Sequence, residues 1–233
     1  MNLGDFVTFA KEFTGKKGFT PAQVKSFVNM AKLSLQQRHN FAFTRTEATL
    51  SYPSSTGTGV ALPSDFKSFY HDHAVRVVTG GLDYPLEASS EMRELRRLFS
   101  SSVPSFDNET GVLVATTTRT SKDATPPRYY TIPGPFTAGA QTHKLRTLPE
   151  QLSQSLQVTY YAWLPDYSAD ADQDFLLARG YDLLLWETLK IANTFIFQES
   201  KLPINVDAAQ AAFDRFERLD NELDGSAGPI DID

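Results

Sequence analysis

The chain has 233 residues, with 28 acidic side chains, 22 basic side chains and no cysteine. This length suits one large domain or two small ones, and the lack of thiols excludes a disulfide framework, thiolate zinc sites and cysteine catalysis. The net charge of −6 lacks the basic excess typical of proteins that grip nucleic acid, and no apolar stretch reaches the roughly 18 residues of a membrane helix. We expect a protein that is made in the cytoplasm and contacts no membrane.

The first forty residues are predicted to be helical. A short helix is expected over residues 3–13. A second helix should begin after Thr20, because Thr20 is an N-cap candidate, Pro21 fits the first helical position and Gln23 completes a capping box. This helix should end near Arg38. Apolar residues at helical spacing predict its buried stripe: Val24, Phe27, Val28, Ala31 and Leu35.

Short strand-like segments follow from Phe41 onward. Residues 41–52 are rich in threonine and aromatic side chains and fit a strand or hairpin, and residues 54–59 form a small-residue loop. A helix is expected over residues 90–99. Further strands are predicted at residues 74–79, 111–118, 128–132, 142–147 and 156–163. The last of these is partly apolar on both faces, which predicts a central strand. Short strands separated by proline and glycine turns predict a small barrel or sandwich.

Helical periodicity returns after Pro165. Ser168 and Asp170 are the predicted caps, and Gly180 should separate this helix from the next. The buried stripe of the next helix is predicted to be Tyr181, Leu184, Leu185, Thr188, Ala192 and Phe195.

A last helix is predicted from about Asn205 or Asp207 to Gly225. Its expected buried stripe is Ala209, Ala212, Phe213, Phe216, Leu219 and Leu223. Short amphipathic helices cannot bury their stripes alone, so the helices from both chain ends should pack on each other.

The predicted fold class is therefore α+β, with an antiparallel helical bundle built from both chain ends and a small β-barrel or sandwich inserted in it. The bundle comprises residues 1–40 plus 165–224. Residues 41–164 form the inserted strand-rich domain, and residues 225–233 form an extended C-terminal tail.

The most enzyme-like feature is the pair of histidines that flank Asp72. His71 and His73 point to one side of an extended segment and could ligate a metal, but no third ligand is evident. Residues 57–59 resemble part of a nucleotide loop without the Gly-Lys-Ser/Thr ending, and no Gly-x-Ser-x-Gly elbow is present. We therefore expect no metal, no cofactor and no catalytic residues.

Three alternating aspartates imitate the start of a calcium loop. They are Asp170, Asp172 and Asp174. The pattern then fails, because Phe175 stands where the loop needs glycine and Tyr181 where it needs glutamate. Helix capping explains these aspartates better.

Paired tyrosines occur in two of the predicted strands, at 129–130 and 160–161. They fit a core face with ordinary cross-strand pairing on the other face, and they also fit a subunit interface, where tyrosine is enriched. Both interpretations stay open.

The order of several motifs resembles the head-to-tail adaptor (connector, or neck) proteins of tailed double-stranded DNA bacteriophages. The resemblance covers nearly the whole chain and depends on the order and spacing of the motifs. They are Leu62-Pro63-Ser64-Asp65-Phe66, Pro127-Arg128-Tyr129-Tyr130-Thr131-Ile132, Leu156-Gln157-Val158-Thr159-Tyr160-Tyr161, Tyr181-Asp182-Leu183-Leu184-Leu185-Trp186 and a last amphipathic helix.

This resemblance implies a structural virion protein of the neck, made in the host cytoplasm, with no enzymatic activity. Such adaptors form a ring, usually of twelve subunits, beneath the portal, and DNA passes through the channel without specific binding. The implied partners are other copies of the chain, the portal protein and a downstream tail or nozzle protein. The alternatives are another neck or tail-completion protein, a ligand- or carbohydrate-binding β domain on a helical stalk, and a metal-dependent hydrolase that uses His71 and His73.

The C-terminal tail is the predicted partner-binding segment, because such segments of adaptors often clasp the portal. It is too short and polar to form a core, and Ile230 and Ile232 share one side of an extended chain that could dock on a partner's sheet edge. The alternative is a disordered terminus. The predicted binding residues are Gly225, Pro229, Ile230, Asp231, Ile232 and Asp233.

Overall fold

The computed structural model describes residues 1–14, 19–52, 59–71, 73–79, 82–88, 102–106, 113–118, 128–132, 144–148, 154–195 and 202–225. The chain divides into two compact units. Unit 1 comprises Met1–Thr44 with Trp163–Asp233, and unit 2 comprises Arg45–Ala162. The predicted domains, 1–40 with 165–224 and 41–164, stay a prediction, because compactness alone does not show that a unit folds independently.

Unit 1 begins with two helices, α1 (Leu3–Thr14) and α2 (Pro21–Arg38). The capping box at the start of α2 is confirmed. The backbone N–H of Gln23 donates to Thr20 Oγ1 at 3.3 Å, and the backbone N–H of Thr20 donates to Gln23 Oε1 at 2.9 Å. These two bonds satisfy donors that a helix N-terminus otherwise leaves free, which explains why the helix starts where the sequence predicts.

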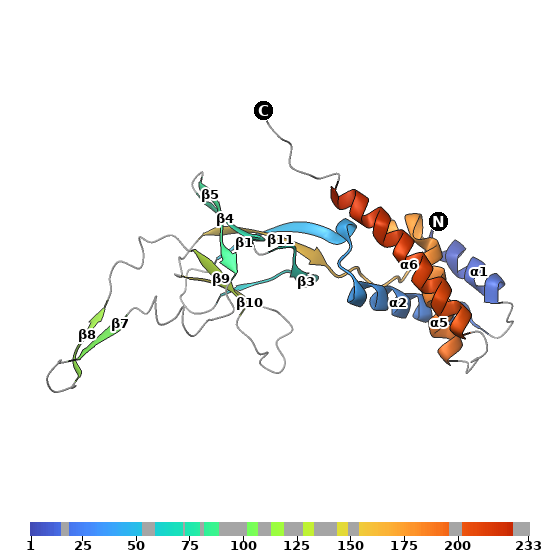
Figure 1. Ribbon diagram of the computed structural model, residues 1–233, viewed down its shortest axis with the longest axis horizontal. Helices are drawn as coiled ribbons and strands as arrows, with labels where there is room; N and C mark the ends of the chain where they lie inside the picture. The colour runs from blue at the N-terminus through green and yellow to red at the C-terminus, as the bar shows by residue number, and fades with distance from the viewer. Residues whose placement is uncertain are drawn as a thin grey trace, which may run out of the picture. The chain divides into compact units, whose positions relative to one another are not determined.

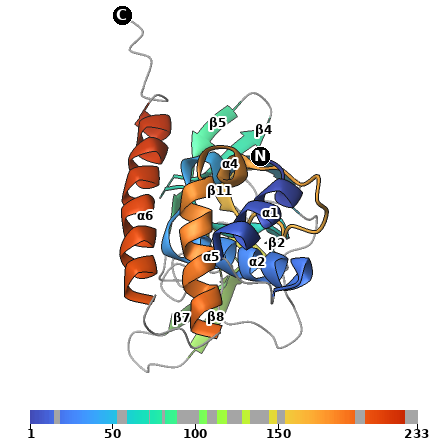
Figure 2. The same cartoon turned by 90° about the vertical axis from the view of Figure 1, so that its right-hand side faces the viewer.

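Within the described residues, unit 1 also contains α4 (Phe175–Arg179), α5 (Tyr181–Phe195) and α6 (Leu202–Gly225), with a 3-10 turn η1 (Ala42–Thr44). Figure 2 shows α5 between α6 and α1. Helix α5 also packs against α2. The shared core includes Leu3, Phe6, Val28, Leu35, Phe41, Leu176, Leu184 and Phe216.

Two predicted stripes are partly wrong in unit 1. Tyr181 and Phe195 of α5 are 45% and 58% exposed, and Leu219 of α6 is exposed as well. Helix α5 has neighbours on several sides, so Leu183 and Leu189 are buried in addition to the predicted stripe. A pattern with one apolar stripe predicts only one buried face, whereas a helix with neighbours on several sides has more than one.

The predicted start of the helix after Pro165 is also wrong. Residues 163–174 are not helical, and Asp174, instead of Ser168 or Asp170, is the N-cap of α4, where its Oδ1 accepts from the N–H of Leu177 at 2.9 Å. The predicted break at Gly180 and the predicted end of α6 at Gly225 are confirmed.

Unit 2 contains a five-stranded sheet centred on β11 (Figure 1). Its strands are β1 (Arg45–Ser51), β3 (Phe66–Phe69), β4 (Val75–Thr79), β5 (Leu82–Pro85) and β11 (Ser155–Ala162). Strand β1 pairs antiparallel with β11 in a register that sets Arg45 opposite Tyr161, and β3 and β4 both pair with β11 as well. The predicted central strand is therefore confirmed.

A four-stranded sheet and a two-stranded sheet complete the described strands of unit 2. They contain β2 (Val60–Ala61), β10 (Lys144–Leu148), β9 (Tyr129–Thr131) and β6 (Glu87–Ala88), and separately β7 (Ser102–Phe106) with β8 (Leu113–Thr118). The described strands thus form three sheets and no closed barrel. The predicted α+β class is therefore confirmed, and the predicted closed barrel is wrong. The predicted helix at 90–99 and the loop residues 54–58 lie outside the described ranges.

The two larger sheets share one core, which includes Tyr52, Leu86, Tyr130, Leu145, Leu156 and Val158. Tyr160 lies in the same core, and its hydroxyl donates to Asp65 Oδ1 at 3.0 Å. Burial, followed by this hydrogen bond, raises the pKa of Tyr160 to about 12.

Tyr160 should make the protein less stable in alkali. An unfolded tyrosine loses its proton near pH 10, whereas folded Tyr160 keeps it to about 12, so the folded state binds more protons in this window and its free energy of unfolding falls as pH rises. Tyr160→Phe should show a shallower decline than the wild type in urea titrations across that window, and the exposed-residue control Tyr181→Phe should follow the wild type. Equal slopes for Tyr160→Phe and the wild type would contradict this assignment.

Candidate functional site

Most of the predicted partner-binding tail lies outside the residues that the structure describes. Gly225 is the last residue of α6. The other predicted residues lie outside the described ranges: Pro229, Ile230, Asp231, Ile232 and Asp233. Their contact with a portal therefore stays a prediction.

His71 and His73 are exposed and lie between β3 and β4. The backbone N–H of His73 donates to His71 Nδ1 at 2.9 Å, and the two ring centroids are 6.4 Å apart. Within the described ranges, no group of three or more His, Cys, Asp or Glu side chains could hold a metal. The two histidines therefore offer two possible metal ligands, and the described residues offer no third.

The three aspartates of the calcium-like pattern serve separate partners. Asp170 pairs with Lys25 at 2.6 Å. Asp172 accepts the backbone N–H groups of Ser168 and Ala169 at 2.6 and 2.8 Å, and these bonds lower the pKa of its carboxyl group. Asp174 caps α4. The interpretation as capping groups is thus confirmed for Asp174, and the carboxylates do not converge on a shared ligand.

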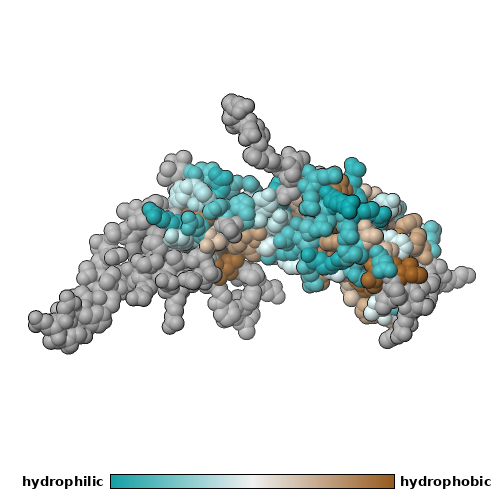
Figure 3. All heavy atoms as spheres, viewed as in Figure 1, coloured by the Kyte–Doolittle hydropathy of each residue, from teal (hydrophilic) through white to brown (hydrophobic). Residues whose placement is uncertain are grey.

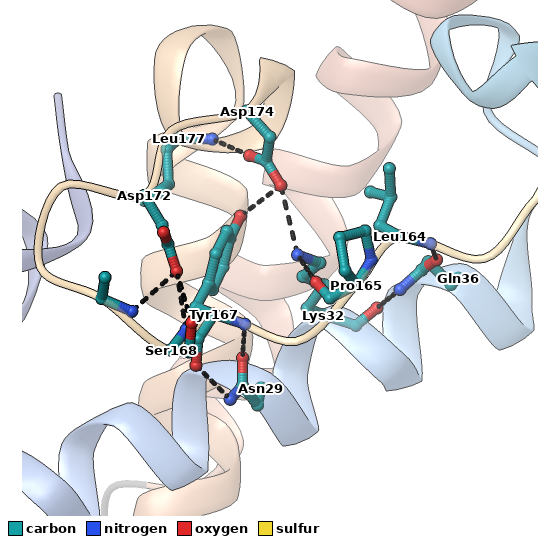
Figure 4. Close-up of polar contacts among 11 residues, drawn as sticks. Asn29, Lys32, Gln36, Leu164, Pro165, Tyr167, Ser168, Asp172, Asp174 and Leu177 are labelled. Carbon is teal, nitrogen blue, oxygen red and sulfur yellow. Dashed lines mark hydrogen bonds and ion pairs between the residues drawn. The ribbon is translucent and has the colours of Figure 1, made fainter. Parts of the chain in front are cut away.

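A polar row on α2 holds the segment that returns from unit 2 (Figure 4). The α2 polar row consists of Asn29, Lys32 and Gln36, and the return segment comprises residues 163–174. Asn29 exchanges two hydrogen bonds with the backbone of Tyr167, since its Oδ1 accepts at 2.9 Å and its Nδ2 donates at 3.0 Å. Gln36 Oε1 accepts from the N–H of Leu164 at 2.6 Å. The row therefore binds irregular backbone much as a neighbouring strand would.

Lys32 is the centre of this arrangement and is only 2% exposed. Its Nζ donates to the carbonyl of Pro165 at 2.5 Å, lies 3.3 Å from Asp174 Oδ2 and sits 3.5 Å from the centroid of the Tyr167 ring. The Tyr167 hydroxyl donates to the same Asp174 oxygen at 2.6 Å. A buried ammonium is costly unless it is paired, and here a carboxylate, a carbonyl and an aromatic face surround it.

The electrostatics of this cluster follow from its burial. Desolvation lowers the pKa of Lys32, and Asp174 partly offsets that shift. Desolvation and the hydrogen bond to Asp174 raise the pKa of Tyr167. Asp174 already accepts from Tyr167 and Leu177 and pairs with Lys32. These groups therefore hold the return segment against α2.

The α2 polar row was not among the predicted site residues, because apolar spacing alone does not indicate it. Asn29, Lys32 and Gln36 are three and four residues apart, so they share one helix face beside the apolar stripe. Polar residues at helical spacing next to a buried stripe are the signal that could have indicated them.

A second polar cluster joins α6 to the end of α2 and to η1. Asp220 is buried, and its two carboxylate oxygens accept the N–H of Ala42 at 2.9 and 2.8 Å. His39 Nε2 lies 3.3 Å from Asp220 Oδ2, and the ring of His39 packs 4.9 Å from that of Phe41. This cluster provides hydrogen-bond acceptors for the backbone N–H of Ala42, close to the point where the chain leaves unit 1.

A shallow hollow of about 470 Å³ lies on unit 2 and is lined by residues of both charges, among them Arg45, Glu47, His71, His73 and Arg76. Arg76 makes a two-pronged ion pair with Asp83 at 2.8 and 2.7 Å. Glu47 accepts from Gln157 at 2.7 Å. Asp83 offsets the charge of Arg76, whereas the neutral amide of Gln157 leaves the charge of Glu47 in place, so the hollow carries charges of both signs.

The tyrosine pairs are mainly core residues. Tyr130, Tyr160 and Tyr161 are buried, and the Tyr161 ring packs 5.7 Å from that of Tyr70. The core interpretation is confirmed for these three, and a subunit interface at the pairs stays a prediction.

The packed helices and sheets form an α+β fold, and the order of motifs along the chain resembles the class of phage head-to-tail adaptors. A comparison with family models supports this class directly. The chain belongs to the SU10 adaptor protein family, whose model matches residues 1–233. No curated protein matches the chain.

Membership implies a phage adaptor, that is, a structural component of the virion with no enzymatic role, which interacts with portal and tail proteins and assembles with itself. None of the helices in the described part of the chain is both long and apolar enough to cross a membrane.

Proposed function

We propose that the protein forms a ring beneath the portal, extends the DNA channel and joins the head to the tail. The observation that carries this proposal is the match of the SU10 adaptor family to the entire sequence. Twelve subunits are the expected ring size from the resemblance to phage adaptors.

The two units suit different tasks within such a ring. The helical residues 1–40 and 165–224 would form the bundle of the ring, and the inserted residues 41–164 would contact the next tail component. The net charge of −6 favours free passage of DNA, because an acidic wall repels phosphate. DNA would thus pass without specific binding.

The C-terminal tail would bind the portal. Ile230 and Ile232 alternate with Asp231 and Asp233, so an extended tail presents one apolar side and one acidic side. Such a segment can add to an exposed sheet edge, where backbone hydrogen bonds supply affinity and alternate side chains supply specificity. The segment would order on its partner in a coupled folding and binding step.

Removal of residues 225–233 should abolish portal binding. The measurement is native mass spectrometry of the protein mixed with its portal, which counts the subunits in each complex. Ile230→Ser with Ile232→Ser should weaken binding at least tenfold, whereas the interleaved control Asp231→Ser should weaken it much less. Full portal binding by the truncated chain would remove the tail from the proposal.

The same measurement tests the ring itself. A protein that stays monomeric with its portal present would overturn the proposed function. A ring that binds a tail component but not the portal would assign the chain to another level of the neck.

A further inference from the structure

Lys32 and Asp174 form an ion pair that is largely shielded from water. Figure 3 shows hydrophilic residues (teal) on the outside of unit 1, where water surrounds them. Lys32 is instead 2% exposed, the side chain of Asp174 is 18% exposed, and Nζ lies 3.3 Å from Oδ2. A pair of charges loses its solvation in such a place, so the transfer of one proton from the ammonium to the carboxylate costs less than in water. The lowered pKa of Lys32 has the same cause, since desolvation produces it.

The neutral form of this pair contains the two groups that make an amide. An uncharged amine is a nucleophile, whereas an ammonium group is not, and a protonated carboxyl group accepts a nucleophile far better than a carboxylate does. The two groups are held within 3.3 Å of each other by the fold. Such confinement replaces an encounter in solution and raises the effective concentration of the amine at the carboxyl carbon by many orders of magnitude.

Two hydrogen bonds give the oxygens of Asp174 different roles (Figure 4). The backbone N–H of Leu177 donates to Oδ1 at 2.9 Å, so it stabilises the negative charge that develops there when an amine adds to the carboxyl carbon. The hydroxyl of Tyr167 donates to Oδ2 at 2.6 Å, so it is placed to give its proton to that oxygen. Oδ1 is therefore suited to become the amide oxygen, and Oδ2 is suited to leave as water.

The surroundings of the amine suit both the reaction and its product. The carbonyl of Pro165 accepts from Lys32 Nζ at 2.5 Å, and it can accept equally from the N–H of an amide. The ring of Tyr167 covers the same nitrogen, with its centroid 3.5 Å away. A cavity of about 300 Å³ is lined by Lys32, Tyr167 and Asp174 together with residues of the return segment. This cavity provides space for a released water molecule.

We propose that Lys32 and Asp174 condense into an isopeptide bond. One proton passes from the ammonium to Oδ2, and Nζ then adds to the carboxyl carbon. The Oδ2 hydroxyl takes the proton of Tyr167 and leaves as water, while the Tyr167 oxygen takes a proton from the nitrogen. The products are one amide and one water molecule, and no oxidant, metal or outside substrate takes part. The reaction occurs once in each chain and has no turnover.

The bond has a structural consequence that goes beyond the proposed ring. It would join α2 to the return segment and close a covalent loop from residue 32 to residue 174, and this loop contains all of unit 2, Arg45–Ala162. A force that pulls on unit 2 would then be carried by a covalent bond. Without the bond, it would be carried by the hydrogen bonds of the α2 polar row.

Mass spectrometry of the full chain tests this inference. Protein that is purified, kept folded and then denatured should have a mass lower by one water molecule than the sequence mass. Proteolysis should release a branched peptide that joins Lys32 to Asp174. The full sequence mass without a branched peptide, after prolonged incubation of the folded chain, would overturn the proposal. The measurement uses no portal, so this failure would leave the proposed ring standing, and a failure to form rings would leave the bond standing.

A second ion pair supplies an internal control in the same sample. Lys25 and Asp170 also join α2 to the return segment, and their charged atoms are only 2.6 Å apart. Their side chains are 27% and 74% exposed, so both groups keep their hydration and their charges. This pair should give no branched peptide. Branched peptides at both pairs in equal yield would overturn the proposal, because proximity alone would then produce them.

Two variants assign the roles of the reacting groups. Lys32→Arg keeps a positive charge but removes the amine, so this variant should keep the full sequence mass. Tyr167→Phe keeps the ring over Nζ and removes the proton donor, so it should form the bond at least about tenfold more slowly. Circular dichroism first establishes that each variant is folded. Loss of water in Lys32→Arg would overturn the assignment to Lys32, and an unchanged rate in Tyr167→Phe would overturn the role of the hydroxyl.

Discussion

Replacement of Lys32 by methionine should lower the free energy of unfolding by about 3 kcal/mol, because removal of one partner of a buried ion pair leaves the other charge uncompensated. Methionine lacks only the terminal ammonium position of the side chain, so the loss reports mainly on charge and hydrogen bonding and not on a large cavity. The remaining Asp174 would retain only the bonds from Tyr167 and Leu177. The measurement is urea-induced unfolding followed by circular dichroism.

The matched control is Asp174→Asn in the Lys32→Met background. Asparagine is also a good N-cap, so α4 keeps its cap while the unpaired charge disappears. The double variant should therefore be more stable than the sum of the two single losses allows. Strict additivity would show that Lys32 and Asp174 do not depend on each other, in contradiction to the cluster described for the α2 polar row.

Phe216→Ala should cost about 3–5 kcal/mol, the range for loss of a large core aromatic residue. Phe216 of α6 packs edge-on against Phe41, with the ring centroids 5.5 Å apart, and it also contacts Phe43 and Phe175. The ring therefore joins α6 to η1 and to α4. The free energy of unfolding from chemical denaturation is the quantity to measure, and a loss below about 1 kcal/mol would contradict this role.

Gly180 provides a control for the position of the same ring. A Cβ atom at this residue would lie 2.6 Å from Phe216 Cε2, so Gly180→Ala should destabilise the protein by about 1–3 kcal/mol through overpacking. Gly180→Ala should cost less in a Phe216→Leu background, because the clashing ring atoms are absent there. An equal cost in both backgrounds would show that backbone conformation, and not the ring, requires glycine.

Elements whose signals are local could be predicted from the sequence. The capping box of Thr20 and Gln23 fixes the start of α2 through bonds within four residues. Strand β11 was predicted to be central because both of its faces are partly apolar, and it indeed pairs with strands on both edges. In each case the residues that determine the structure are those that carry the pattern.

Features that depend on tertiary partners could not be predicted in this way. Tyr181 and Phe195 follow the spacing of a buried stripe, but the neighbours of α5 lie elsewhere and leave them exposed. Lys32 is buried only because the carbonyl of Pro165 and the carboxylate of Asp174 come from far along the chain. Strands as short as Val60–Ala61 have too few residues to show alternation.

The same distinction between local patterns and features that depend on a partner applies to the candidate site. The adaptor class could be predicted because the order of motifs extends over the chain, and the family match confirms it. The portal-binding role proposed for residues 225–233 depends on a surface of another protein, so the amino-acid pattern of this chain specifies only one half of such a contact.

The register of β1 and β11 has a consequence for how such proteins diversify. Arg45 and Tyr161 are opposite each other, so the chain enters and leaves unit 2 on neighbouring strands, about 5 Å apart. A segment whose two ends lie side by side can be exchanged for another, or for a short turn, while the flanking helices keep their own core. An exchange of the whole insert would therefore leave both connection points of unit 1 in place, so that one helical unit can carry different inserts.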